Sequence, residues 1–464
     1  MGLKKCEVLA SCLVLWLLPA FGVKASNLER NNTRLQNSPF VLPIVKRDSL
    51  LNGLQLMTIE QPSAETVSIH LRINSGALFD LAGKGGLADI TAGMLLKGGG
   101  GLNAKAVTDT VEQSGLTINI TTGWDSTNIV TSGPADTLDT LFDLLGKLVI
   151  TPAFDQKELD SLKASRAAAM GNELRNDAVA VHRKALEACY GSFPFGRPAR
   201  GTAESIGQIQ RQDLVYFHSR FYLANNSALV VSGNATAEQV TRLARSKLGA
   251  WKKGEKVPAT FKPAEAQAAR RIFILDRSED QSVRAAIAQI GLSRRADDYL
   301  AAMVMSDVLN KHASKLASVH AKTTIEADID ARLLAGPLFV HISSTPDDLP
   351  GDLTVVLDTM STLISGAPTN ESVEAAKAAL IAAMGAQLRT PAGTADILLD
   401  IETYGLGRDY VVNFANRVNA ISPVDVQRAA RNYLKPQSVS IAVAGPAARL
   451  ESSMKKLGTV VVLK

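Results

Sequence analysis

The stretch Ala168-Ala169-Met170-Gly171-Asn172-Glu173-Leu174-Arg175 recurs as Ala382-Ala383-Met384-Gly385-Ala386-Gln387-Leu388-Arg389, 214 residues later (168 to 382). A second pair of segments agrees with the first, since Leu229-Val230-Val231-Ser232-Gly233 returns as Ile441-Ala442-Val443-Ala444-Gly445, 212 residues later (229 to 441). Two pairs in the same order and at nearly one offset are hard to obtain by chance. The sequence therefore predicts a tandem duplication that gives two homologous domains.

Around the first copy, the sequence changes between two kinds of apolar period. Some segments alternate apolar and polar residues, which is typical of half-buried strands, and others have the longer period of helices. The expected strands are 54–59, 67–73, 116–120 and 127–131, and the expected helices are 86–97, 135–149 and 155–175. The first half is therefore predicted to be a mixed sheet covered by helices.

The duplication and the local composition together divide the chain. A segment rich in Lys, Ala and Pro without apolar periodicity separates the two copies and is expected to be a linker. The predicted parts are a signal peptide (1–25), a polar lead-in (26–44), an N-terminal domain (45–255), the linker (256–268) and a C-terminal domain (269–464).

Composition excludes two classes of protein. The chain has 464 residues, of which 46% are hydrophobic and 20% charged, so it can bury sizeable cores and is not a disordered chain. The formal net charge of +5 is spread along the sequence without a run of five or more Lys or Arg. We therefore expect no nucleic-acid partner.

The N-terminus has the features of a secretory signal peptide. Lys4 and Lys5 precede an apolar stretch at 8–23, and a small-residue cleavage site ends at Ala25. We expect export to a bacterial periplasm. Two alternatives stay open, a lipoprotein modified at Cys12 and a retained membrane anchor. After cleavage Cys189 alone remains, so we expect no internal disulfide.

Several segments resemble one family of proteins. They are Gly85–Ala88 leading to Met94–Gly98, Pro152–Phe154 before a long helix, and the pair Ser192–Pro198 and Gly201–Ile206. Together they resemble the insulinase/pitrilysin-type metallopeptidases, which include mitochondrial processing peptidase. The resemblance implies an α+β fold of two tandem homologous domains, each a mixed, mostly antiparallel sheet packed with helices, forming half of a clamshell.

Active members of that family hold zinc with an H-x-x-E-H motif, in which two histidines one helical turn apart reach one ion and the glutamate acts as general base. In this sequence Asp89, Ala92 and Gly93 stand at the His, Glu and His positions. The family's third ligand is a glutamate seven residues after another acid, and Asn172 falls there, with Glu173 one residue away. We therefore expect no zinc, no other cofactor and no catalytic residue, because Asp89 and Glu173 alone suit calcium or magnesium only weakly.

No other part of the sequence replaces the missing ligands. None of the six histidines, His70, His182, His218, His312, His320 and His341, has a partner four residues away with an acid between them. The resemblance also leads us to expect an Arg and a Tyr after residue 310, which in active members hold substrate and the oxyanion. Residues 317–332 contain no Tyr.

Three functions remain open. The first is a noncatalytic peptide-binding or regulatory subunit that pairs with a catalytically active homologue, or with itself, around unfolded peptides. The second is an exported metalloendopeptidase with an unrecognised site. The third is a structural scaffold subunit. The missing ligands favour the first.

Overall fold

The computed structural model describes residues 40, 43–277, 282–318 and 322–463. The predicted signal peptide, its cleavage position at Ala25 and the alternatives that involve Cys12 lie outside these residues, and so does His320. No helix in the described ranges is both long enough and apolar enough to cross a membrane.

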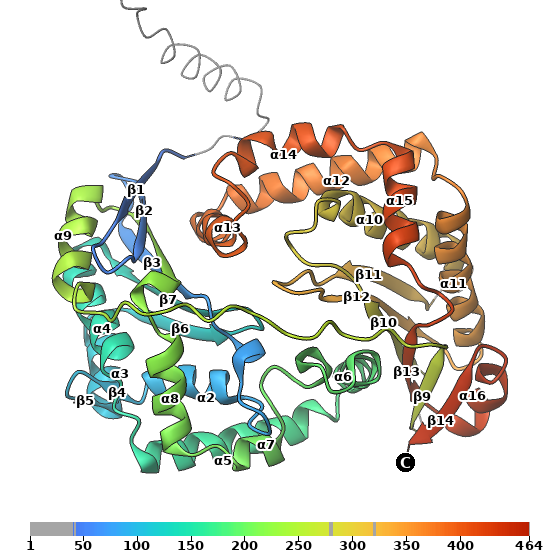
Figure 1. The fold of residues 1–464 in the computed structure, drawn as a ribbon, viewed down its shortest axis with the longest axis horizontal. Helices are drawn as coiled ribbons and strands as arrows, with labels where there is room; N and C mark the ends of the chain where they lie inside the picture. Colours follow the sequence, from blue (N-terminus) through green and yellow to red (C-terminus); the bar gives the residue numbers. More distant parts are fainter. Residues whose placement is uncertain (1–39, 41–42, 278–281, 319–321, 464) are drawn as a thin grey trace, which may run out of the picture. The chain divides into compact units, whose positions relative to one another are not determined.

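The first sheet has six strands in the order β1-β2-β8-β3-β7-β6 (Figure 1). Strands β2 and β8 are parallel, and every other neighbouring pair in this sheet is antiparallel. The strands are Val45–Ser49 (β1), Gln55–Glu60 (β2), Thr66–Ile73 (β3), Thr117–Thr122 (β6), Thr127–Pro134 (β7) and Ser227–Gly233 (β8). All four strands expected from the alternating pattern are present, as β2, β3, β6 and β7.

The second sheet repeats the first. Its order is β11-β12-β10-β13-β9-β14, in which β13 and β14 are parallel to β9 and the remaining pairs are antiparallel. The strands are Arg271–Asp276 (β9), Val283–Ile290 (β10), Thr324–Ile329 (β11), Pro337–Ser344 (β12), Ser440–Gly445 (β13) and Thr459–Leu463 (β14). Since β2-β8-β3-β7-β6 and β9-β13-β10-β12-β11 have the same order and directions, the predicted α+β fold of two homologous domains is confirmed.

Helices follow the strands in the same sequence in both halves. In the first half they are Leu87–Leu95 (α2), Ala104–Gln113 (α3), Leu138–Ile150 (α4), Gln156–Glu173 (α5), Asp177–Tyr190 (α6), Ala203–Gly207 (α7), Arg211–Phe221 (α8) and Ala237–Leu248 (α9). In the second half they are Tyr299–Ala317 (α10), Leu349–Ser365 (α11), Asn370–Leu388 (α12), Pro391–Tyr404 (α13), Tyr410–Asn419 (α14), Pro423–Tyr433 (α15) and Ala447–Met454 (α16). A short hairpin of Gly98–Gly99 (β4) and Leu102–Asn103 (β5) follows α2.

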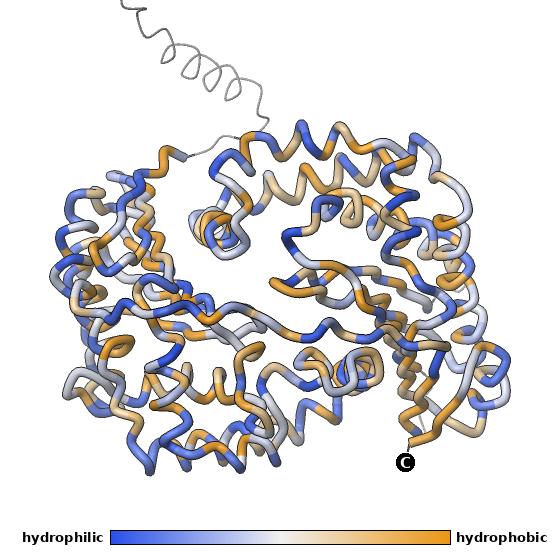
Figure 2. Tube along the Cα trace, viewed as in Figure 1, coloured by the Kyte–Doolittle hydropathy of each residue, from blue (hydrophilic) through white to orange (hydrophobic). Residues whose placement is uncertain are grey.

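One face of each sheet packs against helices of its own half. In β3 the period-two residues Val67, Ile69, Leu71 and Ile73 are all buried in the core that contains α2, α4 and α8. An equivalent core lies between the second sheet and α10, α11 and α15. Figure 2 shows mostly hydrophobic residues along β9, β13 and β14; β13 is buried along its whole length, whereas the edge strand β14 is largely exposed.

The other face of each sheet is covered by a helix from the opposite half. Helix α6 packs on β10 and β13 of the second sheet, where Ala286, Ala288 and other small residues accept it. Helix α13 packs on the first sheet, where Leu398 contacts a cluster that includes Val230 of β8. The repeated stretches 168–175 and 382–389 lie at the ends of α5 and α12, directly before these two helices. The repeat therefore marks the points where the chain crosses between halves (Figure 1).

Residues 256–268, where the composition predicts a linker, contain neither helix nor strand. The segment is nevertheless attached along its length. Phe261 contacts the ring of Phe193 at a centroid distance of 6.1 Å, and Gln267 donates a hydrogen bond to the Ala188 carbonyl at 2.8 Å.

Candidate functional site

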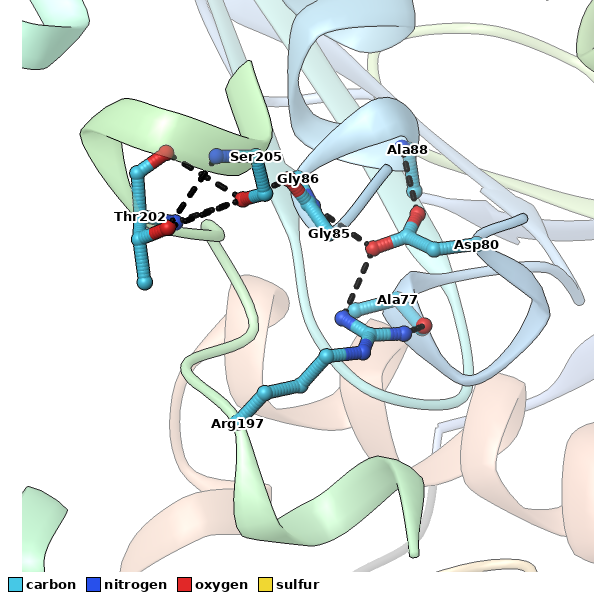
Figure 3. A network of polar contacts seen from close by, with 8 residues as sticks. All are labelled: Ala77, Asp80, Gly85, Gly86, Ala88, Arg197, Thr202 and Ser205. Atoms are coloured by element: carbon cyan, nitrogen blue, oxygen red, sulfur yellow. Dashed lines mark hydrogen bonds and ion pairs between the residues drawn. The ribbon is translucent and has the colours of Figure 1, made fainter. Parts of the chain in front are cut away.

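Helix α2, which has the degenerate motif, begins at a buried carboxylate. Asp80 accepts hydrogen bonds from the backbone N–H groups of Gly86 (2.7 Å) and Ala88 (2.8 Å), which are two of the free donors at the start of a helix (Figure 3). Arg197 Nη1 donates to the same carboxylate at 2.8 Å, and its Nη2 donates to the Ala77 carbonyl. Burial raises the pKa of Asp80 to about 6, against the opposing effects of Arg197 and the two N–H donors. The Gly-Arg-Pro stretch thus fixes where α2 starts.

A glycine is required at the same place. Gly86 has φ +92°, and a Cβ there would lie 2.4 Å from the Arg200 carbonyl oxygen. Ser205, at the start of α7, donates to the Gly85 carbonyl at 2.8 Å (Figure 3). These contacts hold α2 against the 197–205 segment and explain why the two motifs occur together.

The three motif positions of α2 are all inside the protein or beneath α5. Asp89 and Ala92 are buried, and a Cβ on Gly93 would lie 3.0 Å from Leu162 of α5. Neither Ala92 nor Gly93 has a side-chain donor atom. Asp89 forms an ion pair with Arg166 of α5, with 3.1 Å between Oδ2 and Nε. Arg166 also lies close to Gly93, since its Nη2 is 3.9 Å from the position of that Cβ.

The second carboxylate of this region belongs to Glu173. Asn172, at the position of the family's third ligand, has no carboxylate. Asn172 is exposed at the end of α5, whereas Glu173 is half-buried and pairs with Arg200 at 3.4 Å. Burial raises the pKa of Asp89, the cations Arg166 and Arg200 lower it, and Glu173 raises it. The structure therefore brings together two carboxylates and two guanidinium groups at this place.

Sequence reasoning missed both arginines of this cluster. A signal for Arg166 was present, because Arg166 stands seven residues before Glu173, the spacing that separates the two acids in active family members. Arg200 follows the recognised Gly-Arg-Pro motif by three residues, and nothing in the sequence alone connects it with Glu173.

These residues do not fit a zinc ion. Zinc sites in proteins use three or four Cys, His or carboxylate ligands, and here the one buried donor, Asp89, already pairs with Arg166. In the part of the chain that the structure describes, no group of three or more His, Cys, Asp and Glu side chains could hold a metal ion. A guanidinium at the motif also repels a second cation.

Two of the histidines that the structure describes contact backbone or ring groups of other elements. His218 Nε2 lies 2.9 Å from the Val149 carbonyl, and His182 of α6 stacks with His341 of β12 at a centroid distance of 5.4 Å. His70 is buried, and its Nδ1 has no hydrogen-bond partner among the described residues. Cys189 is buried.

The region in which we expected the second-half Arg and Tyr also has a structural role. Arg332 is buried, forms an ion pair with Asp330, and its guanidinium carbon lies 4.9 Å from the Trp124 ring and 4.4 Å from the Phe195 ring. It therefore joins the two halves.

Comparison with known proteins identifies relatives of both halves. The sequence model described as Insulinase (Peptidase family M16) matches residues 55–203, and the one described as Peptidase M16 inactive domain matches residues 208–380. An uncharacterized zinc protease of Rickettsia bellii is 24% identical over 216 residues, 47% of this chain and 52% of that protein. The chain thus matches about half the length of that relative. The mitochondrial-processing peptidase subunit beta of Lentinula edodes is 24% identical over 432 residues, 87% of this chain and 90% of that protein.

Solved structures share the whole two-domain fold. A crystal structure described as a peptidase M16 inactive domain from Pseudomonas fluorescens has a TM-score of 0.78 and 20% identity, and covers 87% of this chain and 98% of its own. A protease from Helicobacter pylori has a TM-score of 0.78 and 16% identity, with coverage of 88% and 100%. At these identities the likeness establishes the fold alone.

Proposed function

Because this chain belongs to the insulinase family of peptidases, we propose that it is a noncatalytic member that acts as the peptide-binding or regulatory subunit of an exported zinc peptidase pair. The observation that carries the proposal is the ion pair between Asp89 and Arg166 at the motif, beside Ala92 and Gly93, which have no ligand atoms. The family's zinc activates a water molecule and polarises the peptide carbonyl. The described residues of this region supply no group for either task.

The open edge of the first sheet supports peptide binding. Strand β6 is the last strand on its side, so one row of its backbone N–H and C=O groups has no neighbouring strand in the described part of the chain. Strand β6 packs beside α2 and has the sequence Thr-Ile-Asn-Ile-Thr-Thr. An extended peptide can pair with its open edge by main-chain hydrogen bonds and add a strand to the sheet. Such binding needs no metal.

The proposed partner is a catalytically active homologue of the same fold. The Lentinula edodes relative is named as a subunit of a peptidase, and the present chain matches it along most of its length. Export to the periplasm follows from the signal-peptide pattern at residues 1–25. Self-association is the alternative assembly.

The test combines elemental analysis with an activity assay. The mature chain is purified, its zinc content is measured, and cleavage of a fluorogenic peptide is followed with the chain alone and after mixing with its nearest active homologue. We expect no stoichiometric zinc and cleavage that the chain increases only in the mixture. One zinc per chain, together with chelator-sensitive cleavage by the chain alone, would establish the metalloendopeptidase alternative instead. If the activity of the homologue is unchanged by this chain and the two proteins form no complex on gel filtration, the subunit proposal is overturned.

A further inference from the structure

A cavity of about 440 Å³ lies in the C-terminal half, where the loop before α10 meets the end of α13 and helix α14. Three arginines and three tyrosines form much of its wall: Arg294, Arg295, Arg417, Tyr299, Tyr404 and Tyr410. It belongs to elements other than α2 and α5, so it is separate from the degenerate motif.

Acids offset the positive charge of this wall only in part: Asp297 lines the cavity, and Asp400, which pairs with Arg72, acts electrostatically on Arg294. Among the described residues, none of the three arginines forms an ion pair with a carboxylate. Arg294 Nη2 donates to the Tyr410 hydroxyl at 3.0 Å, and Arg295 donates to the Tyr404 and Thr403 carbonyls at 2.9 and 3.2 Å. Asp297 also lines the cavity, but it is exposed and leaves an excess of positive charge.

The guanidinium group of Arg294 is held between aromatic rings, and one of its nitrogens donates no hydrogen bond within the described structure. Its guanidinium carbon lies 4.0 Å from the Tyr299 ring and 5.4 Å from the Tyr410 ring, so the two aromatic rings fix the plane of the group. Its Nη1 is buried and makes no hydrogen bond within the described structure. A buried cationic group costs free energy unless it is paired, and in the described part of the chain no carboxylate lies within ion-pair distance of Arg294, so this wall suits an anionic ligand.

The start of α10 adds positive potential at the same cavity. Helix α10 is 19 residues long and begins at Tyr299, in the cavity wall. Asp298, the residue before it, makes no side-chain capping bond, because its carboxylate accepts hydrogen bonds from Asn432 (3.2 Å) and Tyr433 (2.6 Å) instead. The Tyr299 N–H donates to the Ala296 carbonyl at 3.0 Å, so it is the dipole of the helix N-terminus that favours negative charge here.

The volume of the cavity and the apolar part of its wall indicate which class of ligand it can bind. A volume of about 440 Å³ is larger than an inorganic oxyanion needs, and Leu300, Leu406 and the tyrosine rings supply apolar surface. The ligand therefore combines an oxyanion with an apolar group. The planar fork of arginine matches a carboxylate with two parallel hydrogen bonds.

We propose that this cavity binds the C-terminal carboxylate of a peptide, with Arg294 and Arg417 on the carboxylate and the terminal apolar side chain against the tyrosines. The proposal rests on the peptide-binding function above and names the part of the peptide that is recognised. A strand pairing at β6 would accept many sequences, whereas this cavity requires a free chain end.

The test measures direct binding to the purified mature chain. An N-terminally fluorescein-labelled peptide that ends in Phe is prepared as the free acid and as the C-terminal amide, and both are titrated by fluorescence anisotropy. We expect the acid to bind about tenfold or more tightly than the amide, the ratio that charge-assisted hydrogen bonds to a carboxylate give. Arg417→Gln should abolish most of that ratio, and Arg389→Gln, at the exposed end of α12, should leave it unchanged.

A second variant and a competitor complete the design. Arg294→Lys retains the charge but loses the fork, so we expect a smaller ratio at an unchanged circular-dichroism spectrum. Equal binding of acid and amide, or equal ratios in Arg417→Gln and the native chain, overturns the cavity proposal while peptide binding itself stands. Displacement of the acid by inorganic phosphate at the same concentration as by unlabelled peptide also overturns it, in favour of a simple oxyanion site. Loss of the subunit function is read separately, in the mixed activity assay.

Discussion

Replacement of Arg166 by methionine tests the interpretation of the motif as an ion-pair cluster. The variant keeps an unbranched apolar stem in place of the arginine methylenes and removes the cation 3.1 Å from the buried Asp89. With an effective dielectric constant of about 20, the direct interaction at that distance is on the order of 5 kcal/mol. The Arg166 side chain is 34% exposed, and Arg200 also acts on Asp89, so solvent and the second cation reduce the net loss to about 2 kcal/mol at pH 7.5.

The pH dependence gives this prediction a sign. Burial raises the pKa of Asp89 in the folded chain above its unfolded value, so the folded state favours the protonated carboxyl, and stability from this group falls as pH rises through the folded pKa. Removal of Arg166 raises that pKa further. The loss in Arg166→Met should therefore be largest at pH 7.5 and clearly smaller at pH 4.

Urea unfolding at both pH values, followed by circular dichroism, measures the effect. Asp89→Asn removes the carboxylate, so the double variant Asp89→Asn/Arg166→Met should recover most of the stability lost in Arg166→Met. An equal loss at pH 7.5 and pH 4, or no recovery in the double variant, would refute the assignment of the loss to an uncompensated Asp89 charge.

Three more predictions concern the contact that fixes the start of α2 and the packing of α6 on the second sheet. Arg197→Met should cost about 2–4 kcal/mol at pH 7.5 and less at pH 5, because the buried Asp80 carboxyl, whose pKa is about 6, then takes up a proton; urea midpoints measure this. Burial lowers the pKa of His182 to about 4, so native stability should fall between about pH 6.5 and pH 4, and His182→Phe should lose less over that range. Ala288→Leu should cost about 1–3 kcal/mol by displacing α6 and speed proteolysis of α6, whereas Ala378→Leu, on the exposed side of α12, should do neither.

The sequence predicted the strands and the duplication because both leave local or repeated patterns. Val67, Ile69 and Leu71 alternate with polar residues since one face of β3 meets its own helices. The exchange of α6 and α13 between the halves was not predictable, because a helix has the same apolar pattern whichever sheet it covers. Ala288 looks like any small strand residue until the opposite helix is in place.

The motif region also has features that could be predicted from the sequence and features that could not. The motif positions of Asp89, Ala92 and Gly93 followed from the resemblance to the family, since a helix fixes which residues of its motif share a face. The rotational register of α5 could not be predicted from the sequence. Asn172 and Glu173 are adjacent, and only the packing of α5 on α2 decides which one turns toward Asp89. The arginine partners depend on contacts between segments that are far apart in the sequence.

The cluster also gives the motif region a charge balance of its own. Asp89 and Glu173 keep two carboxylates at this place, and Arg166 and Arg200 supply two positive charges that balance them. Electrostatic balance between α2, α5 and the segment before α7 is thus reached by side chains alone. The two exchanged helices and the Asp80–Arg197 contact hold the surrounding elements independently of any ion. Under the noncatalytic proposal, the zinc chemistry is lost while the open edge of β6 stays in place for the proposed peptide binding.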